Sequence, residues 1–185
     1  MLLITGLGNI GKEYENTPHN VGFVFLDVLR EELSRKDGLQ VSEWINEEKL
    51  FNSQLCKIKK DGEVILILQK PLTYMNRSGI AVRSVVSKFD IDAFILIHDD
   101  LDISLGKYKI QSGKSPKGHK GVISVEGNIG TSEFLRVRIG IENRGGRTIP
   151  GEDYVLQKYS EDELTTLKEC VHESVQELLS TIFAF

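Results

Sequence analysis

The sequence has few cysteines and no long apolar run. Only two of its 185 residues are cysteines, Cys56 and Cys170, and their wide separation fits neither a disulfide framework nor a zinc-binding pair. The longest apolar runs, near Ile65 and Ile95, have about five residues, whereas a membrane-spanning helix needs about 20. We therefore expect no membrane span, no signal peptide and a location in the reducing cytoplasm.

The chain also lacks linkers, internal repeats and low-complexity stretches. Hydrophobic residues make up 40% of it and charged residues 27%, which is ordinary for a globular protein with a packed core. A chain of this length commonly forms one domain. We expect a single domain over residues 1–185.

Acidic residues are absent from residues 103–125, although the chain as a whole carries a net charge of −4. This segment contains five lysines, which are Lys107, Lys109, Lys114, Lys117 and Lys120. Such a run is often only a solvated surface loop, but a local positive field also binds the phosphates of a polyanion. Two lysines on one face of a predicted strand, with glycines following, favour a phosphate-binding surface.

Strand and helix patterns alternate along the whole chain. Strands are expected at residues 2–5, 53–59, 64–69, 93–97, 107–111 and 134–141, with an outer strand at 41–45. Helices are expected at residues 20–33, after Asn76 as N-cap, at 122–129, and after the capping box that begins at Ser160. Residues 98–102 are expected to form a loop. This order predicts a single-domain α/β fold with a mixed, mostly parallel twisted sheet covered by helices.

Residues 6–11 match the glycine pattern G-x-G-x-x-G of dinucleotide-binding proteins, directly after a predicted strand. In those proteins a helix starts at the third glycine, and an acidic residue ends the second strand. Here residues 12–18 have no helical pattern, and Glu31 and Glu32 fall inside a predicted helix. We therefore reject nucleotide binding and expect the glycines to form a tight turn that places Asn9 over a cleft.

His19 and Asp99 each follow a predicted strand, at residues 2–5 and 93–97. Because the loops after parallel strands open at one edge of a sheet, we expect these two side chains to meet. An aspartate that holds one ring nitrogen of a histidine leaves the other nitrogen free to take a proton from water. The acidic segment 98–102 could instead bind a metal, but the nearby lysines and the scarcity of other acidic residues disfavour a metal site.

These segments, in this order, resemble the bacterial-type peptidyl-tRNA hydrolase family. The matching segments are residues 6–11 with Tyr14, 17–23, 71–79, 98–102 with Gly106, 118–121, and 134–141 with 154–156. The resemblance implies a cytoplasmic enzyme without metal or cofactor, typically a monomer, which cleaves the ester between a peptide and the 3′-terminal ribose of tRNA.

The resemblance also implies roles for individual residues. His19 corresponds to the catalytic base and Asp99 to the carboxylate that orients it, while Asn9 and Asn76 hold the peptide end of the substrate and the attacking water. The residues expected to line the cleft or contact substrate there are Tyr14, Met75, His119 and Lys120. The residues expected to contact the acceptor stem and 3′ end of the tRNA are Lys107, Lys109, Lys114, Lys117 and Arg136.

The chain departs from the family pattern at a few positions. Ile10, Pro18 and Lys120 stand where the family usually has proline, arginine and asparagine, and the loop at residues 143–150 also differs. Lys120 keeps an alternative open, a non-enzymatic RNA-binding relative of the family, as in intron splicing. The joint presence of His19, Asp99 and the two asparagines favours the enzyme, because a pure RNA-binding protein does not need an oriented imidazole.

Overall fold

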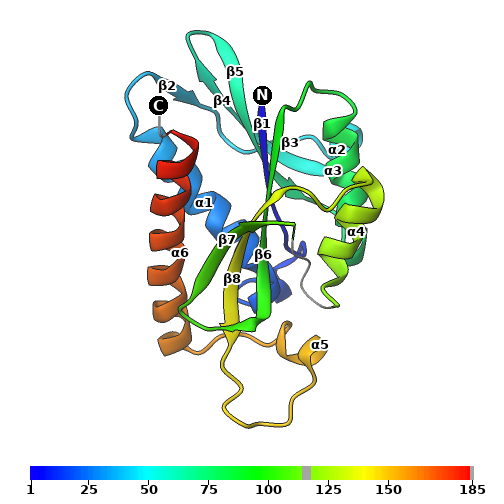
Figure 1. Ribbon diagram of the computed structural model, residues 1–185, viewed down its shortest axis with the longest axis vertical. Helices are drawn as coiled ribbons and strands as arrows, with labels where there is room; N and C mark the ends of the chain where they lie inside the picture. The colour runs from blue at the N-terminus through cyan, green and yellow to red at the C-terminus, as the bar shows by residue number, and fades with distance from the viewer. Residues whose placement is uncertain (114–117, 184–185) are drawn as a thin grey trace.

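The computed structural model describes residues 1–113 and 118–183, and an eight-stranded sheet lies at its centre (Figure 1). The strands are β1 (Leu2–Gly6), β2 (Leu39–Val41), β3 (Ile45–Asn46), β4 (Ser53–Lys60), β5 (Glu63–Pro71), β6 (Ala93–Ser104), β7 (Tyr108–Ser112) and β8 (Leu135–Glu142). Their order is β2-β4-β5-β1-β6-β8-β7, and β3 also pairs with β4. Only β4 and β7 run opposite to the other strands, so the expected α/β fold with a mostly parallel mixed sheet is confirmed.

Helices cover both faces of the sheet, α1 and α6 on one side and α2, α3 and α4 on the other (Figure 1). The α-helices are α1 (Val21–Ser34), α2 (Glu48–Phe51), α3 (Ser78–Val86), α4 (Lys120–Ile129), α5 (Gly151–Tyr154) and α6 (Glu161–Ile182). Three short 3₁₀ turns are η1 (Lys12–Tyr14), η2 (Pro18–Asn20) and η3 (Met75–Arg77). None of the helices in the described ranges is long and apolar enough to cross a membrane.

The central strands are apolar throughout because each of their faces is covered. On β1, Leu3 and Ile4 are both fully buried, but successive side chains of a strand point to opposite faces. Ile4 belongs to the core under α1 and α6, and Leu3 belongs to the second core under α3 and α4. A continuous apolar run is the pattern of such doubly covered strands.

The last helix begins as its sequence predicts. The hydroxyl of Ser160 accepts from the backbone N–H of Glu163, and the Glu163 carboxylate accepts from the backbone N–H of Ser160. This capping box satisfies donors that the first turn of a helix leaves unpaired. A stripe of buried residues that includes Leu167, Val171 and Leu178 then packs α6 onto the sheet.

Three predictions about local structure were wrong. Asn76 is not a helix cap, because it lies inside η3 and the N-cap position of α3 is Arg77, which makes no side-chain cap. The expected outer strand at 41–45 is divided between β2 and β3. Residues 98–102 continue β6 rather than forming a loop, because Asp99 and Asp100 remain paired with β8.

Two glycines set the start of α1 against the end of β1. A Cβ atom on Gly6 would collide with the backbone of Gly22, and a Cβ atom on Gly22 would collide with the backbone of Leu7. This close approach needs glycine on both sides. It fixes the position of η2, which immediately precedes α1 and carries His19.

Candidate active site

A cavity of about 610 Å³ opens at the carboxyl ends of β1 and β6. Its walls come from the loop after β1, from η2 and η3, from β6, from the start of α4 and from α5. This is the edge at which parallel α/β sheets commonly place their ligand sites. Among the residues expected to act in the site, Asn9, His19, Met75, Asn76 and Asp99 all line the cavity.

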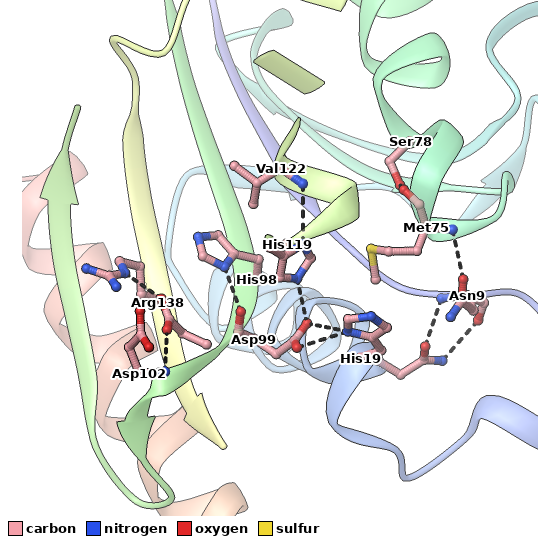
Figure 2. A network of polar contacts seen from close by, with 12 residues as sticks. Asn9, His19, Met75, Ser78, His98, Asp99, Asp102, His119, Val122 and Arg138 are labelled. Atoms are coloured by element: carbon pink, nitrogen blue, oxygen red, sulfur yellow. Dashed lines mark hydrogen bonds and ion pairs between the residues drawn. The ribbon is translucent and has the colours of Figure 1, made fainter. Parts of the chain in front are cut away.

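His19 and Asp99 meet in this cavity, as Figure 2 shows. Nδ1 of His19 lies 2.9 Å from both carboxylate oxygens of Asp99. The backbone N–H of His19 also donates to the carbonyl oxygen of Val155 at 3.0 Å, which fixes the turn that carries the ring. The His19 side chain is 14% exposed, and its Nε2 has no hydrogen bond to any residue that the structure describes. The ring can therefore donate through Nδ1 and accept a proton at Nε2.

Asp99 is a buried carboxylate held in its ionised form. Burial by itself raises the pKa of Asp99, but the adjacent imidazoles of His19 and His119 and their hydrogen bonds to the carboxylate lower the pKa by a larger amount. The net direction is well below the ordinary pKa of an aspartate. The site therefore keeps a negative charge beside His19.

His119 is a second imidazole on the same carboxylate. Its Nε2 lies 2.9 Å from Oδ1 of Asp99, and its ring centre lies 5.1 Å from that of His19. His119 is also the N-cap of α4, since its Nδ1 accepts from the backbone N–H of Val122 at 3.3 Å. The sequence placed His119 beside the cleft but did not predict its contact with Asp99.

Asn9 is held so that one end of its amide remains available to a ligand. Its Oδ1 accepts from the backbone N–H of Met75 at 2.8 Å. The Asn9 backbone exchanges two hydrogen bonds with the side chain of Asn20, at 2.8 and 3.0 Å. The NH₂ group of Asn9 makes no hydrogen bond within the described part of the chain, so it can donate into the cavity. Sequence reasoning assigned no role to Asn20.

Asp100 and His98, which flank Asp99 on β6, are both buried but differ in their partners. Asp100 accepts from Nε of Arg138 at 2.7 Å and from the backbone N–H of Asp102 at 2.8 Å. His98 is fully buried and its Nδ1 donates to the carbonyl oxygen of Asp99 at 2.8 Å. Burial first, and then the nearby His119, lowers the pKa of His98 to about 3, so His98 stays neutral.

His19, Asp99 and His119 bring three candidate metal-ligand atoms within 4.8 Å of one another. A histidine that binds a metal through one nitrogen normally donates its other N–H to an acceptor. Nδ1 of His119 instead faces a donor, the N–H of Val122. This donor set does not suit a metal ion, which supports the metal-free site that the sequence predicts.

Three of the residues predicted to contact substrate, Met75, Lys120 and Tyr14, lie in different surroundings. Met75 is buried in the cavity wall, and Lys120 lies at its mouth, 3.7 Å from the carboxylate of Glu152. Tyr14 belongs to η1 and is not among the described residues that line the cavity, so its contact with substrate stays a prediction. Tyr74 and Leu156 also line the cavity, and both are large exposed side chains of the kind that contact ligands. They lie in the segments 71–79 and 154–156 that resemble the family, but sequence reasoning gave neither of them a role.

The basic residues predicted to contact tRNA are divided between surface and core. Lys107 precedes β7, Lys109 lies on it, and both are exposed. Arg136 is completely buried, paired with Glu126 at 2.7 Å and bonded to the carbonyl oxygen of Ser132, so its predicted direct contact with tRNA was wrong. The two remaining candidates, Lys114 and Lys117, lie outside the described residues.

Comparisons with known proteins agree with this geometry. Residues 3–184 match the family model described as "Peptidyl-tRNA hydrolase". The chain is 40% identical over 181 residues to the peptidyl-tRNA hydrolase of Bacillus subtilis (strain 168), covering 95% of this chain and 89% of that protein. It is also 40% identical over 171 residues to that of Mycoplasma capricolum, covering 91% and 86%. The crystal structure of peptidyl-tRNA hydrolase from Acinetobacter baumannii superposes with a TM-score of 0.82 at 30% identity, covering 97% of this chain and 87% of that one.

Proposed function

This chain belongs to the peptidyl-tRNA hydrolase family, and we propose that His19 is the base with which it activates water. The reaction is hydrolysis of peptidyl-tRNA. The single observation that carries the proposal for His19 is its contact with the buried, ionised Asp99 at the wall of the cavity. Family membership disfavours the alternative of a non-enzymatic RNA-binding protein.

The proposed reaction begins with a water molecule beside Nε2 of His19. Asp99 holds the Nδ1–H of His19, so Nε2 takes a proton from the water as its oxygen attacks the ester carbonyl. The NH₂ group of Asn9 donates to the negative charge that develops on the carbonyl oxygen. The tetrahedral intermediate then expels the ribose oxygen of the tRNA, which takes the proton back from His19. The peptide is released as a carboxylic acid, which loses its proton to solvent, and the tRNA is released with its ribose hydroxyl restored. No covalent enzyme intermediate forms.

We place the RNA on the side of the cavity that carries the lysines. Lys107 and Lys109 are exposed on one edge of the sheet, and Lys120 lies at the cavity mouth. Exposed lysines contribute affinity for phosphates that falls as salt rises. In this proposal the acceptor stem lies along these lysines, the 3′ end reaches His19, and the peptide lies against Met75 and Asn76. A metal-free monomer located in the cytoplasm stays a prediction from the sequence and the resemblance.

The experiment that tests this proposal is the replacement of His19 by alanine. With an N-blocked aminoacyl-tRNA as substrate, we expect kcat to fall on the order of 10²- to 10⁴-fold, because the general base is removed. Binding of tRNA should change little, because His19 makes no part of the lysine surface. The matched control is His172→Ala, which removes an exposed histidine from α6 and should leave turnover unchanged. Parental turnover by His19→Ala would end the proposal.

A further inference from the structure

We propose that His119 is a positioning residue that holds the carboxylate of Asp99, and that it neither binds substrate nor carries the proton taken from water. This inference rests on the proposed roles of His19 and Asp99. It concerns which of the two imidazoles on the carboxylate can accept a proton. The contacts of His119 on each of its ring nitrogens carry it.

The start of α4 determines which nitrogen of His119 bears hydrogen. The backbone N–H of Val122 is always a donor, so Nδ1 of His119, which lies 3.3 Å from it, must offer a lone pair. The ring hydrogen of neutral His119 is then on Nε2, which points at Oδ1 of Asp99 over 2.9 Å (Figure 2). A second ring hydrogen, on Nδ1, would point at the backbone N–H of Val122, so that two donors would face each other. The geometry therefore leaves His19 as the imidazole that takes up a proton.

His119 lines the cavity, but neither of its ring nitrogens is left for a ligand, because Nε2 contacts Asp99 and Nδ1 accepts from the N–H of Val122. The His119 side chain is only 7% exposed, whereas that of the next residue, Lys120, is 66% exposed. The titratable groups that face it are Asp99, the ring of His19 at 5.1 Å and the ring of His98 at 5.2 Å. His98 is neutral and the neighbouring Asp100 is paired with Arg138, so no further charge among the described residues competes for the Asp99 carboxylate.

The consequence for the reaction is the orientation of Asp99. Nδ1 of His19 reaches both carboxylate oxygens, and His119 supplies the other donor, to Oδ1. Without His119, the buried carboxylate of Asp99 keeps only His19 as a donor in the described structure and can rotate about its Cβ–Cγ bond. His19 would then lose the fixed partner that aims its Nε2 into the cavity, as in other sites where supporting hydrogen bonds orient the reacting group.

The first test is the tautomer of each histidine in the intact protein without substrate. The chain has four histidines, at positions 19, 98, 119 and 172, and ¹⁵N NMR of the side chains distinguishes hydrogen on Nδ1 from hydrogen on Nε2. We expect His119 to bear hydrogen on Nε2 alone, and His98 and His19 to bear it on Nδ1. His119→Gln and His172→Gln assign the resonances. Hydrogen on Nδ1 of His119 would overturn the inference whether or not His19 proves to be the base.

The second test is kinetic and separates positioning from substrate binding. We expect His119→Ala to lower kcat on the order of 10- to 100-fold while KM changes less than about twofold, because Asp99 loses its support but the cavity keeps its other residues. His119→Gln, which can still donate an N–H, should recover part of kcat. A raised KM with unchanged kcat would show that His119 binds substrate and would overturn the inference. His172→Gln is the matched control.

Discussion

The carboxylate of Asp99 lies between the imidazoles of His19 and His119. Whether this carboxylate is ionised depends on the balance between its burial and its contacts with the two rings. Burial favours a neutral acid, but the two histidines and their hydrogen bonds outweigh it and lower the pKa. At His98, one residue earlier, burial outweighs the charges of Asp99 and Asp100 and lowers the pKa, so the ring stays neutral. Its Nε2 has no hydrogen-bond partner within the described part of the molecule. Two adjacent residues on β6 therefore differ in charge, since Asp99 is ionised and His98 is neutral.

The buried neutral state of His98 predicts that stability falls in mild acid. The pKa of His98 is about 3 in the folded protein but near 6.5 in the unfolded chain. Below about pH 6.5, His98 therefore binds a proton in the unfolded chain but not in the folded protein. The free energy of unfolding decreases as pH falls. We expect this residue to lower the free energy of unfolding by about 1–2 kcal/mol between about pH 6.5 and pH 5.

Urea unfolding at the two pH values measures this contribution. His98→Gln lowers stability at both values, but its decrease in stability from pH 6.5 to pH 5 should be smaller than that of the parent protein by about 1–2 kcal/mol. The exposed His172 serves as the control, since His172→Gln should leave the parental difference intact. If stability fell by the same amount from pH 6.5 to pH 5 in the parent and in His98→Gln, the result would contradict a neutral, buried His98.

At this scale the sequence predicts some contacts and misses others for physical reasons. His19 and Asp99 were expected to meet because each follows a parallel strand, and that rule needs only strand order. The contact of His119 depends on where α4 begins and how far it lies from β6, which no local pattern specifies. Arg136 was expected to contact tRNA because of the family resemblance, but its side chain is buried and paired with Glu126 on α4.

At the scale of the elements, α3 and α4 approach each other at Gly79. A Cβ atom on Gly79 would collide with the backbone carbonyl of Ser124 on α4, and the backbone N–H of Gly79 donates to the Ser124 hydroxyl at 3.0 Å. The two helices begin at η3 and His119, and residues at both starting points line the cavity. The position of this part of the cavity wall therefore depends on the helix contact.

We predict that Gly79→Ala destabilises the protein by about 1–3 kcal/mol, because α3 and α4 must separate to admit the methyl group. The matched control is Gly127→Ala on α4, where a Cβ atom meets no other group in the described structure. That change should stabilise the helix by about 0.5–1 kcal/mol, since alanine loses less conformational entropy than glycine. Thermal unfolding of both variants gives the comparison, and a Gly79→Ala variant as stable as the parent would contradict the close packing.

The sequence predicts the elements better than their ends. The core helix α6 was expected from its capping box and apolar stripe, and both are formed by residues within the same helix and its cap. The end of β6 was placed too early because its charged residues are typical of a loop. Tertiary contacts decide otherwise, since Asp100 gains Arg138 from the neighbouring strand and β6 continues to Ser104.

At the scale of the whole molecule, exposed lysine pairs lie near both edges of the sheet, but only one pair belongs to a segment without acidic residues. β7, with Lys109 and the adjoining Lys107, forms one edge, and β2 and β3 lie at the other beside β4. Lys59 and Lys60 near the end of β4 are also exposed, so both edges carry a lysine pair. Only the pair near β7 belongs to the segment without acidic residues.

We predict that the lysines at the β7 edge, and not those near β2, cause the salt dependence of tRNA binding. Replacing Lys107 and Lys109 by alanine should weaken binding and reduce the slope of log affinity against log salt by about one for each phosphate that the variant no longer neutralises. Replacing Lys59 and Lys60 in the same way should change the slope little. Binding of tRNA measured over a range of salt concentrations distinguishes the two variants. An unaltered slope after removal of Lys107 and Lys109 would exclude that edge from the RNA-binding surface.

The hydrogen bond from the backbone of His19 to Val155 has a consequence for biosynthesis. A growing polypeptide is itself attached to a tRNA until its translation ends. His19, Asp99 and His119 are all made before Val155, so a nascent chain acquires the reacting groups first and their anchor last. The order of the segments along the chain thus delays completion of the site until the ribosome has made most of the protein.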